Sequence, residues 1–293
     1  MHKKIIWVAS YPKSGNTWLR SILSSLFYSS DGKFDFELLQ YIKHFDSPEN
    51  YLFVKKINKN DYENLSKIKV ISKYRIQAQE KLITKKNFIF FKTHSANVSL
   101  NSHQYTNEKN SFGLIYIVRD PRDIVISYSK YQNISIDRAI EKITNKAVIE
   151  YSGFKNNDEF PSLITNKLPY IMSSWDINFL SWKRLDTPQL FIKYEDLIND
   201  PLLIMKKITT FFQNKIKIEI ENLDSKIENI VNTTNFQFLK KQEQKYGFSE
   251  STTYSDFFRK GTSNQWKEIL TKKQAERIEM AFKPLMKRLG YIT

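Results

Sequence analysis

Five consecutive apolar residues, Ile5 to Ala9, and the helical pattern that follows them constrain the fold most. A short run that is apolar at every position suits a strand buried on both faces, which is the usual setting in a parallel sheet. From about residue 17 to residue 27, apolar side chains recur on one face of a helix. A buried strand that leads directly into a helix is the first element of an α/β fold.

The same alternation continues along the chain. Three further strands are predicted, at residues 88–92, 114–118 and 189–193. Three further helices are predicted, at residues 120–131, 200–212 and 271–289, the first two opening on Asp-Pro. Residues 134–166 are polar and predict a helix followed by a mobile loop, a usual place for a substrate lid. We therefore expect one α/β domain over residues 1–293, with a central parallel sheet flanked by helices.

Composition limits the classes of partner. The chain has 46 Lys and Arg against 31 Asp and Glu, a net charge of +15, which favours anionic partners such as nucleotides or polyanions. The absence of cysteine excludes disulfides and a Cys nucleophile, and the four His lack ligand spacing, so no metal site is expected. No apolar window approaches the roughly 20 residues of a membrane span. These features predict a cytoplasmic protein without a transmembrane segment.

The turn between the first strand and the first helix has the composition of a phosphate-binding loop. Gly15 allows close approach of the backbone, the helix supplies its positive end, and Lys13 adds a charge. Further donors are Ser14, Asn16 and Thr17. The alternative is an ordinary turn with a solvated lysine. The Walker A pattern G-x-x-x-x-G-K-[ST] is absent, so the turn is at most P-loop-like.

Two other strands end in residues suited to chemistry. His94 follows the strand that contains Lys92, and carboxyl ends of parallel strands are where ligands bind. A histidine there can act as a general base, although a lone histidine is more often a packing or surface residue. Arg119 ends another strand and can bind a phosphate through two hydrogen bonds, or can pair with its acidic neighbours.

A basic turn near the C-terminus offers a second phosphate clamp. Arg259 and Lys260 precede Gly261, so two cationic side chains stand beside a flexible backbone position. A solvated basic turn is the alternative. The ten Lys and Arg between residues 55 and 86 are instead expected to form a solvated helical face, with binding of an anionic acceptor as the alternative.

In chain order, these segments resemble the cytosolic-type sulfotransferases that use 3′-phosphoadenosine 5′-phosphosulfate (PAPS). Residues 12–19 are similar to the phosphosulfate loop of that family, Y-P-K-S-G-T-T-W, with Asn16 in place of a Thr. Residues 91–94 are similar to its K-T-H motif. Arg119 and Ser127 keep the eight-residue spacing of its 3′-phosphate motif.

Later segments continue the resemblance. Residues 258–267 are similar to R-K-G-x-x-G-D-W-K, with Asn264 and Gln265 where that pattern has Gly and Asp. Tyr194 lies in a match to Y-E-D-L, and residues 234–236 match the T-S-F step that lies against the adenine. By the same resemblance, Trp18 would stack on the face of the adenine opposite to residues 234–236.

The resemblance, which spans residues 5–272, implies in-line transfer of a sulfuryl group from PAPS to a hydroxyl or amine, with release of 3′-phosphoadenosine 5′-phosphate (PAP) and no metal. It implies His94 as general base and Lys92 as the residue that holds the sulfuryl oxygens. Lys13 would stabilise the leaving oxygen, with Ser127 restraining Lys13. Residues implied in nucleotide binding are Lys13, Ser14, Gly15, Asn16, Thr17, Trp18, Arg119, Ser127, Tyr194, Thr234, Phe236, Arg259, Lys260 and Gly261.

Two other function classes remain as alternatives. A P-loop-like kinase or other phosphoryl transferase is disfavoured by the missing Gly-Lys-Ser/Thr. A polyanion-binding module is disfavoured because the basic residues are scattered and no nucleic-acid motif is present, so nucleic acid is not an expected partner.

The acceptor and the oligomeric state are open at this level. Residues 28–87 and 132–170 match no motif, and we expect the acceptor pocket there. The sequence is compatible with a small molecule, a sugar or a lipid-linked compound as the acceptor. Residues 267–276 half resemble the dimer motif of the family, but Lys272 stands where that motif has Val, so a homodimer is possible without being required.

Overall fold

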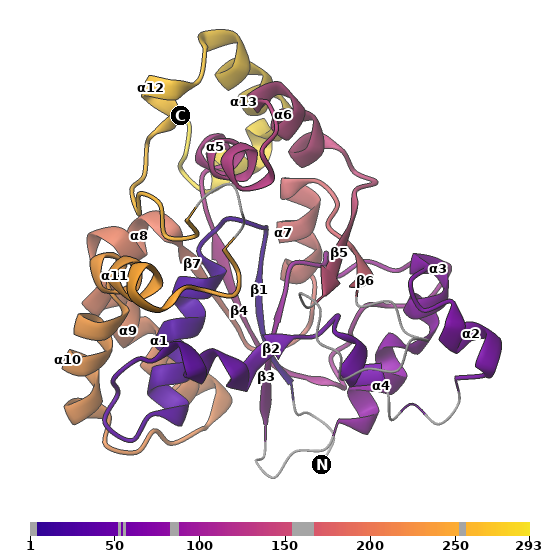
Figure 1. Ribbon diagram of the computed structural model, residues 1–293, viewed down its shortest axis with the longest axis horizontal. Helices are drawn as coiled ribbons and strands as arrows, with labels where there is room; N and C mark the ends of the chain where they lie inside the picture. Colours follow the sequence, from indigo (N-terminus) through magenta and orange to yellow (C-terminus); the bar gives the residue numbers. More distant parts are fainter. Residues whose placement is uncertain (1–4, 52–53, 55–56, 83–87, 154–166, 252–255) are drawn as a thin grey trace. The chain divides into compact units, whose positions relative to one another are not determined.

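The computed structural model describes all residues except 1–4, 52–53, 55–56, 83–87, 154–166 and 252–255, which are grey in Figure 1. The chain forms two compact units. The first comprises Met1–Tyr11, Lys43–Tyr116 and Lys146–Gln189, and the second Pro12–Ile42, Ile117–Asn145 and Leu190–Thr293. That both belong to one domain over residues 1–293 stays a prediction.

A five-stranded sheet has the strand order β2-β3-β1-β4-β7. Its strands are β1 (Ile5–Ser10), β2 (Ile42–His44), β3 (Ile89–Thr93), β4 (Ser111–Val118) and β7 (Gln189–Lys193). β1 is buried at every residue and runs parallel to β3, with Ile5 opposite Ile89 and Ala9 opposite Thr93. The predicted α/β class with a central parallel sheet is confirmed. β2 was not predicted, because its three residues carry no periodic signal.

The first unit adds helices and a hairpin. Its helices are α2 (Lys59–Glu63), α3 (Ile68–Ile71), α4 (Arg75–Lys81) and α7 (Trp175–Lys183). β5 (Ile149–Gly153) and β6 (Lys167–Ile171) form an antiparallel pair that the sequence did not predict. The mobile loop predicted after the helix in residues 134–166 falls largely outside the described residues. Trp175 and Trp182, predicted to be core, are both 0% exposed.

The second unit holds most of the helices. These are α1 (Asn16–Tyr28), α5 (Pro121–Gln132), α6 (Ile136–Thr144), α8 (Tyr194–Asn199), α9 (Pro201–Thr210), α10 (Leu223–Thr234), α11 (Phe236–Tyr246), α12 (Trp266–Ile269) and α13 (Lys272–Arg288). α10 packs against α1 and α11, as Figure 1 shows. Both predicted Asp-Pro caps form: Asp120 accepts from the Arg122 amide, and Asp200 from the Leu203 amide.

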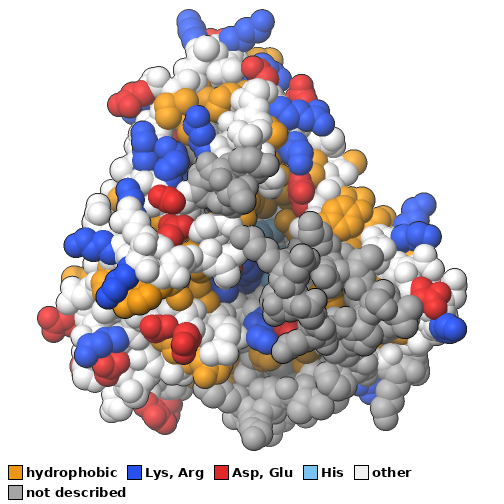
Figure 2. Space-filling view, in the orientation of Figure 1, with side chains coloured by type: hydrophobic (Ala, Val, Ile, Leu, Met, Phe, Trp, Pro, Cys, Tyr) orange, Lys and Arg blue, Asp and Glu red, His pale blue; other side chains and the backbone are white. Residues whose placement is uncertain are grey.

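On the face shown in Figure 2, Lys and Arg side chains are separated by acidic and uncharged ones. No helix in the described part of the chain is long and apolar enough to cross a bilayer.

The expectation that the basic residues of 55–86 are all solvated is wrong at Arg75. Its side chain is 2% exposed and lies 3.3 Å from Asp46, which is fully buried. Arg75 also donates to the Pro169 carbonyl, and Tyr105 donates to Asp46. Burial raises the pKa of Asp46, and Arg75 opposes that shift. The sequence could not reveal this pair because its members are 29 positions apart.

We expect Asp46→Ala to lower the free energy of unfolding by about 3–5 kcal/mol, because removing one partner leaves a buried guanidinium without a counter-charge. Urea denaturation measures the loss. Asp31→Ala is the control, since Asp31 pairs with Lys33 at the exposed surface, and it should leave the urea midpoint nearly unchanged. Equal midpoints for the two variants would show that the buried pair does not stabilise the fold.

Candidate active site

The turn between β1 and α1 adopts an unusual backbone conformation. Lys13 has φ 66° and Gly15 has φ 97°, both in the left-handed region. A Cβ on Gly15 would lie 2.6 Å from Cδ2 of Tyr194, so no larger residue fits there without displacing that ring. A non-glycine residue such as Lys13 is strained at positive φ by about 1–3 kcal/mol. Strain of this kind gathers at ligand-binding turns, and this one leads directly into the N-terminus of α1.

Arg119 joins three segments that are far apart in the sequence. Its Nη1 donates to the Lys13 carbonyl at 3.3 Å and its Nη2 to the Thr262 carbonyl at 3.0 Å. Its guanidinium carbon lies 4.3 Å from the centroid of the Tyr194 ring. The side chain is 7% exposed. The structure therefore brings together the turn after β1, the end of β4, the start of α8 and the basic turn, as the resemblance requires.

Asp123 fixes the basic turn beside Arg119. Its carboxylate lies 3.7 Å from Arg119 Nη2 and accepts the amides of Asn264, at 2.7 Å, and Trp266, at 3.0 Å. Burial raises the pKa of Asp123, and Arg119 opposes the shift. Sequence analysis considered Asp123 only at the start of a helix and as a local partner of Arg119, and that pair is present. The contacts of Asp123 with Asn264 and Trp266 span more than 140 positions, so no local signal could have found them.

The two departures from the family pattern keep the turn intact. Asn264 has φ 62°, the left-handed conformation that Asn tolerates better than most residues, so it can stand where the pattern has Gly. Gln265 accepts a hydrogen bond from Arg259 Nη2 at 3.0 Å. Gln265 therefore orients Arg259 without neutralising its charge.

Aromatic rings surround the glycines of the site. Trp18 meets Tyr194 edge-on at a centroid distance of 5.8 Å and Phe236 at 6.4 Å. A Cβ on Gly261 would lie 2.2 Å from Cγ of Phe236, so the basic turn touches that ring. The Thr234 hydroxyl donates to a carbonyl of its own helix at 2.7 Å. The residues predicted to bind the adenine thus lie together in the second unit.

One polar atom of the turn and one of Arg119 are placed as donors for a bound oxyanion. Ser14 Oγ and Arg119 Nε are buried, and none of the described residues forms a hydrogen bond with either. Buried polar groups are nearly always hydrogen-bonded, so donors placed in this way fit a phosphate or sulfate oxygen. The pKa of Arg259 is lowered by burial and then by repulsion from Arg119. An anion bound near both guanidinium groups would relieve that repulsion.

Thr17 has a partner that the sequence did not suggest. Its hydroxyl donates to Glu250 at 2.9 Å, and Arg20 donates to the same carboxylate at 2.6 Å. Tyr131 donates to the Glu250 carbonyl at 3.2 Å. The hydroxyl predicted to bind phosphate is therefore engaged by a carboxylate in this structure.

The Lys13 ammonium is held by aromatic rings. Its Nζ lies 3.8 Å from the centroid of Tyr131 and 4.2 Å from that of Phe257, both distances typical of cation–π contacts. Ser127, the predicted partner of Lys13, is half-buried one turn before Tyr131 on α5. Lys260 is exposed and Arg259 is half-buried. Tyr131 and Phe257 had no distinguishing signal in the sequence.

His94 lies in the first unit, immediately after β3. Its Nδ1 is 3.0 Å from the Ser10 carbonyl oxygen. The Ser10 hydroxyl lies 3.2 Å from the same nitrogen. A proton on Nδ1, donated to the carbonyl, would leave Nε2 as the basic nitrogen of the neutral ring. The His94 carbonyl accepts from Asn178 at 2.9 Å. Lys92 is half-buried on β3, and its carbonyl accepts the Phe45 amide at 3.0 Å.

Comparison with known proteins identifies the family. Residues 3–290 match the model of the sulfotransferase domain. The chain belongs to the sulfotransferase domain family. Membership supports sulfuryl transfer as its activity, and the predicted family is confirmed.

Curated relatives match along nearly the whole chain. A flavonol 3-sulfotransferase of Flaveria bidentis is 26% identical over 290 residues, which cover 95% of this chain and 80% of that protein. Cytosolic sulfotransferase 10 of Arabidopsis thaliana is 25% identical over 298 residues, covering 97% of this chain and 79% of that protein.

Solved structures support the fold. A mouse sulfotransferase in complex with PAP has a TM-score of 0.55 at 22% identity, covering 98% of this chain and 84% of that one. A retinol dehydratase in complex with retinol and PAP has a TM-score of 0.58 at 18% identity, covering 98% and 82%. At these identities the likeness establishes the fold alone.

Proposed function

We propose that this sulfotransferase-family chain transfers a sulfuryl group from PAPS to a hydroxyl or amine of a small-molecule acceptor and releases PAP. The observation that carries the proposal is Arg119, which ties the Lys13 carbonyl, the Thr262 carbonyl and the Tyr194 ring into one cationic, buried cluster. The names of the similar solved structures state that those proteins bind PAP, which supports the same nucleotide here.

The donor nucleotide has binding groups at both ends. Lys13, the Ser14 hydroxyl and the N-terminal amides of α1, from Asn16 onward, would bind the 5′-phosphosulfate. Arg119 and Arg259 would bind the 3′-phosphate, each as a planar donor, and Ser127, Lys260 and the Gly261 amide would add to that clamp. Thr17 would exchange its Glu250 contact for the nucleotide. Residues that would enclose the adenine are Trp18, Tyr194, Thr234 and Phe236.

His94 is the proposed base that takes the proton of the acceptor. PAPS supplies an activated sulfuryl group when bound. Nε2 of His94 would take the proton from the acceptor as its oxygen or nitrogen bonds to sulfur and the bond to the PAP oxygen breaks. Lys92 would hold the sulfuryl oxygens, and Lys13 would stabilise the charge on the departing oxygen. The Ser10 carbonyl supports this assignment because it can accept a hydrogen bond from Nδ1 of His94, an arrangement that would leave Nε2 basic.

The curated relatives suggest where and on what the enzyme acts. One relative is named for a flavonol, a small hydroxyl compound, and we propose an acceptor of that kind. Another is named a cytosolic sulfotransferase, and we propose a cytoplasmic location. A sugar, an amine or a lipid-linked acceptor, and a homodimer, remain hypotheses for biochemical screening and for a mass measurement in solution.

Calorimetric titration with PAP and with adenosine 5′-monophosphate (AMP) tests the donor site. We expect Arg259→Ala to weaken PAP binding by about 10–100-fold, since a hydrogen bond to a charged group contributes about 1.5–3 kcal/mol. AMP lacks the 3′-phosphate, so its affinity should change little. Lys273→Ala, which removes an exposed charge on α13, is the control.

The results of this titration distinguish a specific role of Arg259 from a general effect of charge and from failure of the proposed function. Equal losses for PAP and AMP in Arg259→Ala would remove Arg259 from the 3′-phosphate site. Equal losses in Arg259→Ala and Lys273→Ala would point to a general effect of net charge. Failure of the unmodified protein to bind PAP would overturn the proposed function and favour the phosphoryl-transfer or polyanion alternatives.

A further inference from the structure

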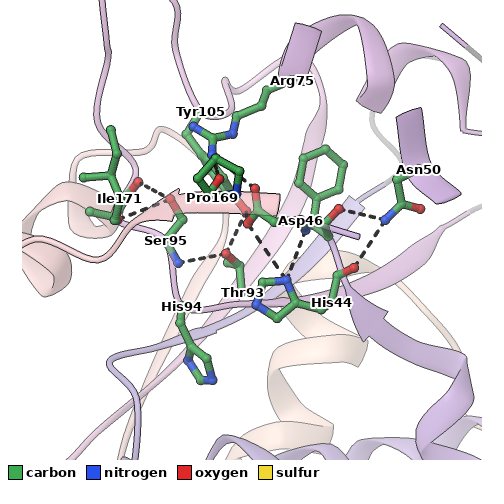
Figure 3. A network of polar contacts seen from close by, with 12 residues as sticks. His44, Asp46, Asn50, Arg75, Thr93, His94, Ser95, Tyr105, Pro169 and Ile171 are labelled. Atoms are coloured by element: carbon green, nitrogen blue, oxygen red, sulfur yellow. Dashed lines mark hydrogen bonds and ion pairs between the residues drawn. The ribbon is translucent and has the colours of Figure 1, made fainter. Parts of the chain in front are cut away.

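The chain on either side of His94 is held by buried side chains. Figure 3 shows Thr93 and Ser95 joined to a polar network, with the His94 side chain pointing away from it. Thr93 Oγ1 lies 2.7 Å from the Tyr105 hydroxyl and accepts the Ser95 amide at 3.0 Å. The Tyr105 hydroxyl donates to the fully buried Asp46 carboxylate at 2.9 Å. This network therefore fixes the backbone before and after His94.

Helix α7 holds the same segment through two buried side chains one turn apart. Asn178 Nδ2 donates to the His94 carbonyl at 2.9 Å, and Trp182 Nε1 donates to the Ser95 carbonyl at 2.8 Å. Both side chains belong to residues that are 0% exposed. Positions four apart on a helix share a face, so α7 presents both donors to one stretch of chain. Of the two, Asn178 is the one bonded to His94 itself.

The Asn178 amide is fixed in one orientation. Its Nδ2 also donates to the Met172 carbonyl at 2.9 Å, and its Oδ1 accepts the Tyr116 hydroxyl at 2.9 Å. Carbonyl oxygens can only accept, so the amide nitrogen must face both of them. Burial raises the pKa of Tyr116, which therefore keeps the proton that its hydroxyl donates. Asn178 thus connects β4 to the residues that follow β3 and β6, which limits the movement of all three.

We propose that Asn178 is a positioning residue that, by holding the His94 carbonyl, sets where the imidazole stands against the acceptor. The inference rests on the proposed function, since it takes His94 as the base. The carbonyl and the side chain of a residue leave from one Cα, so a shift of the carbonyl turns the side chain. A base must lie about 2.6–3.2 Å from the atom whose proton it takes, and a displacement of about 1 Å can cost about 10²-fold in rate.

Asn178→Ala tests the inference through the rate of sulfation of catechol, a small hydroxyl compound, with PAPS in excess. We expect kcat to fall about 10–100-fold, because the imidazole is no longer held in place. PAP affinity, measured by calorimetry, should change little, because the groups proposed to bind the nucleotide lie in the second unit. A kcat near that of the unmodified protein would overturn the inference.

A double-mutant cycle with His94→Ala separates positioning from a general structural role. If Asn178 acts through His94, Asn178→Ala should lower the residual rate of His94→Ala by less than about twofold. A purely structural role lowers the rate by the same factor in both backgrounds. Equal factors would therefore contradict the inference and leave His94 as the proposed base.

Ser181→Ala is the matched control on the same helix. Ser181 is 5% exposed and its Oγ accepts the Asn97 amide at 2.9 Å, so alanine removes a buried hydrogen bond close to His94 in the chain. We expect kcat to stay close to that of the unmodified protein. A loss as large as in Asn178→Ala would show that any weakened contact of α7 lowers the rate, against the inference.

Tyr116→Phe is a milder change for the case that Asn178→Ala does not fold. It keeps Asn178 and removes the hydroxyl that orients its amide. We expect kcat to fall about 2–10-fold, the effect of losing one hydrogen bond. If only this variant folds, an unchanged kcat in it overturns the inference. If both fold, Asn178→Ala decides.

The Cε1 proton resonance of His94 reports its surroundings without an acceptor. The chain has four histidines, and the signal lost in His94→Ala assigns this one. With PAP bound, we expect the resonance to shift in Asn178→Ala and to stay in place in Ser181→Ala. If catechol is not turned over, this comparison decides alone, and an unmoved resonance overturns the inference. Failure of the unmodified protein to bind PAP would instead overturn the proposed function.

Discussion

Replacing His94 by alanine is expected to lower kcat by about 10²–10⁴-fold, the usual contribution of a general base. Alanine removes Nε2 of His94, the nitrogen proposed to act as the base, so the reaction loses its proton acceptor. The measurement is the initial rate of sulfation of catechol with PAPS in excess. PAP affinity, measured by calorimetry, should stay near that of the unmodified protein, because the groups proposed to bind the nucleotide all lie in the second unit.

His103→Ala is the matched control for this experiment. His103 is exposed in a turn, so its removal tests whether loss of any histidine lowers the rate. We expect a rate close to that of the unmodified protein. Near-normal turnover by His94→Ala would assign the proton to another base, and loss of PAP binding in that variant would show a structural defect instead of a catalytic one.

Lys13→Ala is expected to lower kcat by about 10²–10³-fold, the range found when one donor to a developing oxyanion is removed. The lysine ammonium lies against the Tyr131 and Phe257 rings in the second unit, which direct it and limit its motion. Its charge would act mostly as the oxygen departs, so kcat should fall more than the affinity for PAP.

The backbone at Lys13 makes a second variant informative. Because φ is 66°, Lys13→Ala keeps the strain of the turn whereas Lys13→Gly relieves it. If the ammonium is what catalyses, both variants should lose kcat to the same degree, although the glycine variant should be the more stable in urea. A normal kcat in Lys13→Gly would show that the turn needs only its backbone. A loss of PAP affinity as large as the loss of kcat would show that Lys13 serves binding alone.

Sequence reasoning could predict the parts of the proposed donor site because each part is local. A buried strand, a turn with Gly15 and an amphipathic helix are continuous in the chain, and their apolar periodicity is visible without any tertiary information. The strands that end near Lys92 and Arg119 were found in the same way. The resemblance then assigned these segments to one nucleotide.

Contacts that depend on distant positions were not visible. Glu250 bonds to Thr17 across 233 positions, and Asp123 holds the amide of Trp266 across 143. The Asn264 departure could not be judged from the sequence either, because its effect depended on whether the backbone there is left-handed. A side chain recruited by packing carries no periodic or motif signal of its own, so only the folded chain reveals it.

By itself, the sequence determined the α/β class, the positions of the main strands along the chain and the family, and it predicted the phosphate-binding turn, since hydrophobic periodicity and contiguous motifs are properties of short segments. The tertiary structure alone decided that Arg75 is buried against Asp46, that Arg119 gathers three segments, and that Nδ1 of His94 lies 3.0 Å from the Ser10 carbonyl. The reason is physical. A local pattern fixes which face of an element is apolar, but the partner of a polar atom is whichever group the packing of distant segments brings within hydrogen-bonding distance.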